Sequence, residues 1–173
     1  TEKKYRRDIG KAYRKGIEII LKTQIVVDGK PTVWCAQHDK NTLLPAPARS
    51  YELESFSGGE SVGIILFLME SPDPSAAIRK SVTGAVEWLD AHRLKNMRWD
   101  FFTNAEGLRD RKIVYDPEAV DLWARFYDLE TQEPYVCDRD GIKKKSIEEI
   151  GYERRNGYSW YTDAPREVFD KFP

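Results

Sequence analysis

Three arginines lie in settings where a guanidinium group could recognise a planar anion. Arg49 lies in the irregular segment Ala46–Glu52, Arg125 stands among aromatic residues, and Arg139 lies between two aspartates. The guanidinium fork offers paired N–H donors that match the oxygens of a carboxylate or a phosphate. Two interpretations follow from these residues. Either the arginines bind an anionic ligand, or each pairs with an acidic residue of the same chain.

A serine motif offers a different chemistry. Gly59-Glu60-Ser61-Val62-Gly63 fits the pattern G-x-S-x-G, the nucleophile elbow of α/β-hydrolases. That fold needs a strand before the serine, and an acid and a histidine after it. The downstream histidine, His92, falls inside a predicted helix, and few predicted strands surround the motif. A serine hydrolase built on Ser61 is one hypothesis, and the other places Ser61 in the first turn of a buried helix.

Two short motifs contain residue types that bind metal ions in proteins, but neither motif contains enough ligands for a complete site. Cys35, His38 and Asp39 have the spacing of half a zinc site, and the other half is missing. Asp138 and Asp140 resemble the opening of a calcium loop, yet no third acidic ligand follows them in the first half of such a loop. We therefore predict ordinary loops here and no metal ligands.

Helical periodicity is strongest in the first half of the chain. It predicts helices over residues 3–26, 61–69 and 75–92, and the second of these is apolar nearly all round. Between the first two helices lies a long irregular loop, 37–57, which carries Arg49. Loops of this length are uncommon in compact domains and are usually functional or disordered.

The second half of the chain predicts less regular structure. Residues 99–115 are mixed and indicate short strands or loops, whereas the aromatic segment 119–129 suits a strand as well as a helix turn. Residues 142–156 are highly charged, with Lys–Glu pairs one turn apart, and predict a helix that Gly157 ends. Four or five helices with little strand indicate a mainly α protein.

Composition excludes several classes of protein. The chain has 173 residues, 40% hydrophobic and 33% charged, which is typical of a globular domain. A formal net charge of −1 leaves no basic excess to drive non-specific nucleic-acid binding. The longest apolar run, 62–69, is far below the ~20 residues that span a bilayer, and no signal peptide opens the chain. We expect neither nucleic acid nor membrane as a partner. The two cysteines, Cys35 and Cys137, could form one disulfide or remain free.

Longer blocks of sequence are more specific than these short patterns. They are, in chain order, Val33–Asp39, Leu44–Glu52, Ser57–Ile64, Leu122–Tyr127, Arg139–Gly141 and Glu153–Tyr161. Together they resemble polysaccharide lyase family 10, the pectate lyases, over nearly the whole chain. The resemblance implies part of an α/α toroid, an incomplete α/α barrel, with short strands and long cleft-forming loops. Residues 1–173 would then be the C-terminal portion of a single catalytic domain.

The resemblance also implies an activity and the residues that perform it. Family members cleave polygalacturonate by β-elimination with calcium and leave an unsaturated uronate at the new end. The family's Brønsted base falls on Arg49, and two arginines that bind uronate carboxylates fall on Arg125 and Arg139. Further candidates for contact with sugar rings are the aromatic side chains of Trp34, Tyr51 and Tyr158, which suit a core equally well.

The chemistry explains why arginines would serve this reaction. The proton that leaves is at C5, next to a carboxylate, so the transition state accumulates negative charge. Neutralising that carboxylate with a metal ion or an arginine makes the proton more acidic. An arginine base is unusual, because the pKa of its side chain lies above ~12.

The family's main calcium ligands lie upstream of the matched region. The resemblance therefore implies Ca²⁺ held mainly outside this chain, a polygalacturonate or pectin chain as substrate, and the upstream part of the same domain as a partner. A pectin-degrading protein would be secreted or periplasmic. The alternative is a non-catalytic remnant, or inactive fragment, which binds acidic glycans through its arginines without cleaving them.

Overall fold

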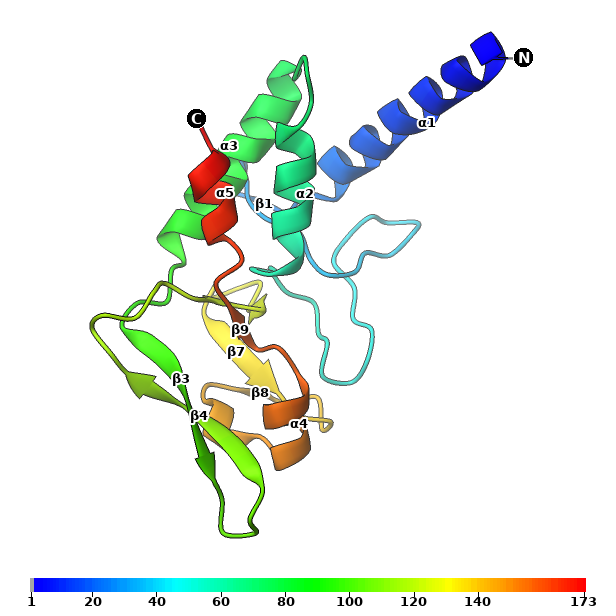
Figure 1. Cartoon of the computed structure of the whole chain (residues 1–173). Helices are drawn as coiled ribbons and strands as arrows, with labels where there is room; N and C mark the ends of the chain where they lie inside the picture. The colour runs from blue at the N-terminus through cyan, green and yellow to red at the C-terminus, as the bar shows by residue number, and fades with distance from the viewer. Residues whose placement is uncertain (1) are drawn as a thin grey trace.

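The longer helices gather at one end of the molecule and most of the strands at the other (Figure 1). The computed structural model describes residues 2–173. The helical end contains α1 (Glu2–Thr23), α2 (Glu60–Met69), α3 (Ala76–Ala91) and the short α5 (Arg166–Lys171), which contacts α2. The three helices that periodicity predicts are confirmed, although α1 ends at Thr23 rather than at residue 26.

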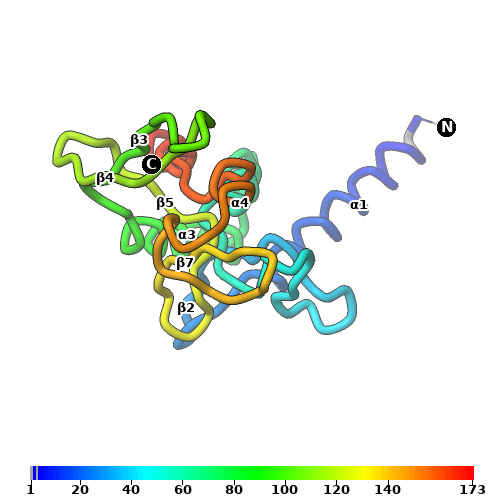
Figure 2. The backbone as a smooth tube through the Cα atoms, turned by 90° about the horizontal axis from the view of Figure 1, so that it is seen from below, coloured from blue at the N-terminus to red at the C-terminus, as the bar shows by residue number. Residues whose placement is uncertain are grey.

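The first half of α1 projects away from the rest of the chain (Figures 1 and 2). Its last turns pack on the core through Ile17, Ile20 and Leu21. Two short strands follow, β1 (Val26–Val27) and β2 (Lys30–Pro31), and pair antiparallel across a tight turn. The loop 37–57 that leads to α2 contains no named helix or strand, in agreement with the sequence.

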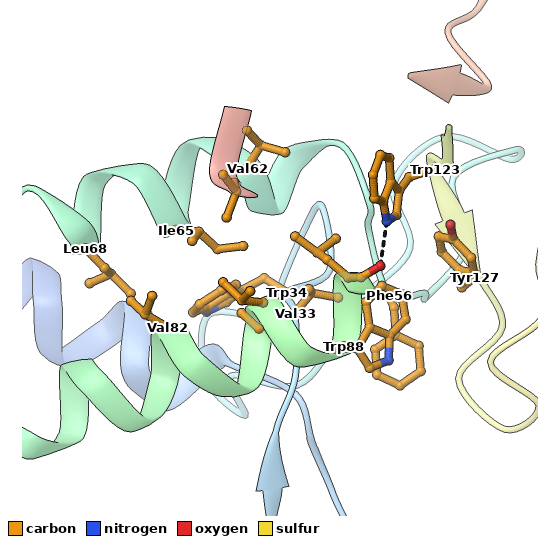
Figure 3. Close-up of a cluster of buried hydrophobic side chains, with 14 of the residues drawn as sticks. Val33, Trp34, Phe56, Val62, Ile65, Leu68, Val82, Trp88, Trp123 and Tyr127 are labelled. Carbon is orange, nitrogen blue, oxygen red and sulfur yellow. Dashed lines mark hydrogen bonds between the residues drawn. The ribbon is translucent and has the colours of Figure 1, made fainter. Parts of the chain in front are cut away.

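A buried apolar cluster joins the helices to the strands (Figure 3). Residues 33–34, α2, α3 and β5 (Trp123–Ala124) all contribute side chains to it. The Trp123 indole N–H donates to the carbonyl oxygen of Leu89 at 2.7 Å, the dashed line in Figure 3. A buried indole keeps its apolar area in the core only when its N–H finds such an acceptor. The bond therefore fixes β5 against the last turns of α3.

An aromatic stack closes the C-terminal end of α3. The Trp88 and His92 rings lie nearly parallel, with centroids 3.9 Å apart and an interplanar angle of 14°. His92 Nδ1 lies 2.7 Å from the Trp88 carbonyl oxygen, and burial lowers the pKa of the imidazole. The Tyr127 hydroxyl donates to the His92 carbonyl oxygen at 2.9 Å, which ties this helix end to β6 (Phe126–Tyr127).

The strand-rich end is built from small antiparallel sheets. β3 (Met97–Thr103) and β4 (Arg109–Tyr115) form a long hairpin that extends from the body (Figure 1). β6 is one edge of a three-stranded sheet with β7 (Pro134–Cys137) and β8 (Lys143–Lys144). β5 pairs with β9 (Tyr161–Thr162).

The expectation of a mainly α fold, part of an α/α toroid, is wrong. Residues 2–173 contain nine strands in four antiparallel sheets besides their helices. Most of these strands are only two residues long, so no alternation of apolar and polar residues can develop in them. The two residues of β5 and those of β6 are all buried, which removes the pattern altogether.

The predicted helix over 142–156 is also wrong. This segment is divided into β8, a 3₁₀ turn (Ile147–Glu149) and α4 (Tyr152–Gly157). Ser146 and Glu149 form a capping box that begins the 3₁₀ turn. Gly151, with extended φ −61° and ψ 156°, interrupts the helical backbone. The Lys–Glu pairs one turn apart indicated a continuous helix and gave no sign of this interruption.

No helix in the described part of the chain is both long and apolar enough to cross a lipid bilayer. Cys35 and Cys137 are both buried free thiols, which answers the question that their spacing left open.

Candidate active site

Arg49 and Arg125 converge on two tyrosine rings. Tyr51 and Tyr158 meet edge to face, with ring centroids 5.2 Å apart. The Arg49 guanidinium carbon lies 4.8 Å from the Tyr51 centroid and 5.7 Å from that of Tyr158. The Arg125 guanidinium carbon lies 4.4 Å from the Tyr158 centroid. Cation–π attraction therefore holds both arginines on one aromatic pair.

Arg139 joins this group through two neighbours. Its Nε and Nη2 donate to the Glu153 carboxylate at 2.8 and 2.7 Å, and Arg154 donates to the same carboxylate at 2.6 Å. The Arg154 guanidinium carbon lies 4.4 Å from the Tyr51 centroid. Arg154 thus links the Arg139 pair to the ring that also carries Arg49.

A turn after β7 brings Arg139 to the loop that bears Arg49. Gly141 has a φ of +72°, which glycine adopts without strain. A Cβ at Gly141 would lie 3.2 Å from the Ser50 carbonyl oxygen, so the turn contacts the Arg49 loop directly. Asp138 accepts the Gly151 N–H at 2.5 Å and fixes the turn to the start of α4. Segments far apart in sequence therefore meet at this site.

Each of these three arginines forms an ion pair with a glutamate. The glutamate side chains are 6%, 30% and 59% exposed in the pairs Arg49–Glu52, Arg125–Glu60 and Arg139–Glu153. The interpretation that each arginine pairs with an acid of the same chain is therefore confirmed, and the arginines also gather at one place. Water screens the exposed pairs, whereas the buried carboxylate depends on its cation.

Glu52 is the most enclosed of these acids. Its carboxylate accepts hydrogen bonds from Arg49 Nε at 2.7 Å, from Arg49 Nη2, from the Arg49 backbone N–H at 3.3 Å and from the Tyr158 hydroxyl at 2.7 Å. The Arg49 hydrogen bond, opposed by burial, lowers the pKa of Glu52 to about 2. The same bond raises the pKa of Arg49 above its ordinary value.

A pocket opens beside Arg125. Its volume is about 270 Å³, and its lining includes Glu60, Arg125 and Ser159. The Arg125 Nε is buried and donates to no residue in the described chain. Burial of a donor without an acceptor costs about 1–3 kcal/mol, so the Nε–H of this pocket-lining arginine is held at an energetic cost.

The aromatic residues predicted to contact sugar are placed differently from one another. Trp34 is 1% exposed and donates through Nε1 to the Ile20 carbonyl oxygen at 2.7 Å. Tyr51 is 4% exposed beneath the arginines. Only Tyr158, among these three, is partly exposed. Trp34 therefore holds α1 on the core, and Tyr51 supports the arginine cluster.

Ser61 is placed as a structural residue. It is fully buried, and its hydroxyl accepts the Trp34 N–H at 3.0 Å and donates to the Trp34 carbonyl oxygen at 3.3 Å. His92 stacks on Trp88, and its Nδ1 lies against the Trp88 carbonyl oxygen and not against Ser61. A buried hydroxyl with these two bonds is not available for attack, and the serine hydrolase hypothesis is set aside.

The possible metal ligands also belong to loops. His38 Nδ1 lies 3.1 Å from the Leu43 carbonyl oxygen, and Asp39 accepts the Asn41 and Thr42 N–H groups of a turn. Across residues 2–173, no three His, Cys, Asp or Glu side chains are grouped so that they could hold a metal ion. The described residues therefore do not fit a calcium site.

Sequence analysis missed the acids of the site and its fourth arginine. Glu52, Glu60 and Glu153 complete the ion pairs, and the Arg154 side chain is 9% exposed between them and the tyrosines. Only the spacing of Arg49 and Glu52 gave a local signal. The partners in the other two pairs lie far apart in the chain.

The fold is mixed α and β, and four arginines, whose guanidinium groups can form paired hydrogen bonds with carboxylates, gather at one place in it. Residues 1–169 match the family model described as pectic acid lyase, and the chain belongs to this family. Two solved structures are similar, a family 10 polysaccharide lyase from Cellvibrio cellulosa and a mutant of it in complex with trigalacturonic acid. Each has 37% identity and a TM-score of 0.81, over 93% of this chain and 49% of the solved chain. The chain thus spans about half the length of these structures. The comparison with curated proteins gives no match.

Proposed function

We propose that this chain forms the arginine-bearing part of a pectate lyase that cleaves polygalacturonate by β-elimination. The observation that carries the proposal is the convergence of Arg49 and Arg125 on one pair of tyrosines, to which Arg139 is linked through Glu153 and Arg154. In this proposal residues 1–173 are the C-terminal portion of a single catalytic domain. Membership of the pectic acid lyase family supports it.

Arg125 and Arg139 bind the carboxylates of neighbouring uronates in this proposal. Their pairs with Glu60 and Glu153 are partly or largely exposed, so exchange of a glutamate for a uronate carboxylate costs little. Binding draws negative charge away from C5 and makes its proton more acidic. The C–H electrons then form the C4–C5 double bond as the C4–O bond breaks.

In this proposal the neutral guanidine form of Arg49 takes the proton from C5. Arg125 and Arg154 lie on the same two rings and disfavour a further positive charge, whereas Glu52 favours it. Because Glu52 raises the pKa of Arg49, we expect the elimination rate to rise steadily with pH over the alkaline range.

The test follows the unsaturated uronate by its ultraviolet absorbance, with polygalacturonate and added calcium. We expect Arg49→Ala to abolish the signal. Arg98→Ala, which removes an exposed arginine from the β3–β4 hairpin, is the matched control and should leave it unchanged. Equal rates in Arg49→Ala and the original chain would contradict the proposed base.

A second candidate is a non-catalytic module that binds acidic glycans. It is favoured by the Arg49–Glu52 pair, since a guanidinium held in its charged form binds carboxylates but does not accept protons. Calorimetry with trigalacturonic acid in the presence of chelator separates the candidates. Binding that persists in chelator, with no unsaturated product when calcium is then added in excess, supports the module.

We propose the upstream part of the same domain as a partner, and that part would contribute the main calcium ligands. We also propose that the protein is secreted or periplasmic. An apolar stripe on α1 supports this partner. Tyr5, Ile9 and Tyr13 are 65%, 68% and 45% exposed along the projecting part of the helix (Figure 2). The matched structures contain about as much chain again as the part aligned here. Mixing this chain with the other half of a family 10 lyase should raise the elimination rate above that of the chain alone, and Ile9→Glu should prevent the increase.

A further inference from the structure

The N–H donors of Arg49 are divided between the protein and the solvent. Nε and Nη2 both donate to the Glu52 carboxylate, which leaves that edge of the guanidinium fully used. Nη1 donates to no residue in the described chain, and the Arg49 side chain is 60% exposed. One edge of the group is therefore fixed while Nη1 remains accessible.

The carboxylate that holds this edge is itself immobilised. The Glu52 backbone N–H donates to the Arg49 carbonyl oxygen at 2.7 Å, and the Ala48 N–H donates to the Glu52 carbonyl oxygen at 2.9 Å. The Tyr158 hydroxyl donates to the carboxylate from a segment far away in the sequence. Each carboxylate oxygen accepts two hydrogen bonds, so Glu52 cannot turn without losing several of them.

We propose that Glu52 is the positioning residue of Arg49, and that Nη1 is the atom that meets C5 of the substrate. This inference rests on the proposed lyase function. The proton moves from C5 to Nη1 of the neutral guanidine, the C–H electrons form the C4–C5 double bond, and the C4–O electrons stay on the leaving oxygen, which takes a proton from water. Glu52 stabilises the guanidinium as it forms, as the aspartate of a serine protease stabilises its histidine.

The first experiment records the Arg49 side-chain N–H signals by ¹⁵N NMR in the full chain. In the original protein we expect a slowly exchanging Nε–H. In Glu52→Gln its exchange with water should be roughly 10- to 100-fold faster, the ratio that loss of a hydrogen bond to a charged group predicts. Glu54→Gln is the matched control, because Glu54 is exposed in the same loop. Equal exchange in the original chain and Glu52→Gln would overturn the inference.

Trigalacturonic acid is then added to the original chain. We expect the Nη1 signal to shift while Nε keeps its slow exchange. Release of Nε on binding would overturn the inference, since Arg49 would then leave Glu52 to meet the substrate. If no Arg49 signal shifts on addition of trigalacturonic acid and Nε still exchanges slowly, the result counts against the proposed function alone. The hydrogen bonds from Arg49 to Glu52 do not depend on a bound ligand.

Steady-state kinetics distinguish a positioning role of Glu52 from a purely structural one. Because Glu52 raises the pKa of Arg49, the rise of the rate with pH should begin at lower pH in Glu52→Gln. For the same amount of neutral Arg49, we expect kcat to fall by roughly 10- to 100-fold, as for a misplaced catalytic group, with KM nearly constant. The uronate-binding Arg125 and Arg139 remain in place in this variant. A proportional loss of kcat and folded protein, with Arg49 exchange unaltered, would instead assign Glu52 to folding.

Discussion

The three arginine–glutamate pairs differ most in how far water reaches the glutamate. Glu153 is largely exposed, Glu60 is intermediate and Glu52 is almost enclosed. The same chemical pair therefore has different consequences at each place. An exposed pair gives way to a competing carboxylate, whereas an enclosed pair persists and sets the charge of its members.

Acid should expose the contribution of Glu52 to stability. Its pKa falls from 4.5 in the unfolded chain to about 2 in the folded one, so its carboxylate favours the folded state above pH 4.5. This stabilisation should be lost as the pH falls from 4.5 towards 2. Urea unfolding at pH 7, 4 and 3 should show a smaller loss in Glu52→Gln than in the original chain. Both proteins will still lose some stability in acid, because a hydrogen bond from Arg155 also lowers the pKa of Asp110 in the folded state. Parallel curves would contradict the prediction.

Arg139 should contribute to affinity but little to stability. Its ion pair is solvent-exposed, so Arg139→Gln should change the free energy of unfolding by less than about 1 kcal/mol. Loss of a hydrogen bond to a carboxylate should weaken trigalacturonic acid binding about tenfold. Calorimetry and thermal unfolding on the same samples check both. An unchanged affinity would remove Arg139 from the binding site.

At the scale of elements, the packing of α3 on β2 depends on the absence of a side chain. A Cβ at Gly84 would contact the Pro31 carbonyl oxygen and lie 2.8 Å from Pro31 Cγ. Gly63, in the neighbouring helix α2, has nothing within 4 Å of the same position. The two glycines therefore share a helical backbone but not an environment.

This contrast gives a matched pair of substitutions. Gly84→Ala should destabilise the chain by about 1–3 kcal/mol, because the backbone of β2 must shift. Gly63→Ala should stabilise it by about 0.5–1 kcal/mol, because alanine loses less entropy in a helix. Urea unfolding measures both, and a similar effect at the two positions would show that α3 does not pack on β2.

At the scale of the whole molecule, α1 has two different halves. Ile17 is 9% exposed on the core, whereas Ile9 is 68% exposed on the projecting half. Ile17→Ala should therefore cost about 2–5 kcal/mol, and Ile9→Ala should stay within about 0.5 kcal/mol. Thermal unfolding compares them. A large loss at Ile9 would mean that the stripe is already covered in solution, for example by a second copy of the chain.

The sequence predicts the helices better than the sheets for a physical reason. α1, α2 and α3 extend over several turns, so their apolar periodicity is visible. β5 is two residues long and is held by pairing with β9, which no local pattern reveals.

The settings of the three site arginines marked them as candidates, the resemblance to a family implied their roles, and only the fold showed that they form a cluster. Arg139 and Glu153 are 14 positions apart and meet through a turn that Gly151 and Asp138 complete. Local spacing does not specify such a partner. The interrupted helix at 142–156 was missed for the same reason, since long-range hydrogen bonds outweigh helix propensity there.

The stack of Trp88 on His92 gives the molecule an optical reporter of its own. A protonated imidazole in contact with an indole quenches its emission, whereas a neutral one does so far less. Since burial lowers the pKa of His92 below 6.5, the emission of Trp88 should stay constant at neutral pH and dim only in more acidic solution. The difference in fluorescence between the original chain and His92→Gln isolates this signal from the other four of the five tryptophans. It would report, without any label, whether the C-terminal end of α3 remains packed against β6.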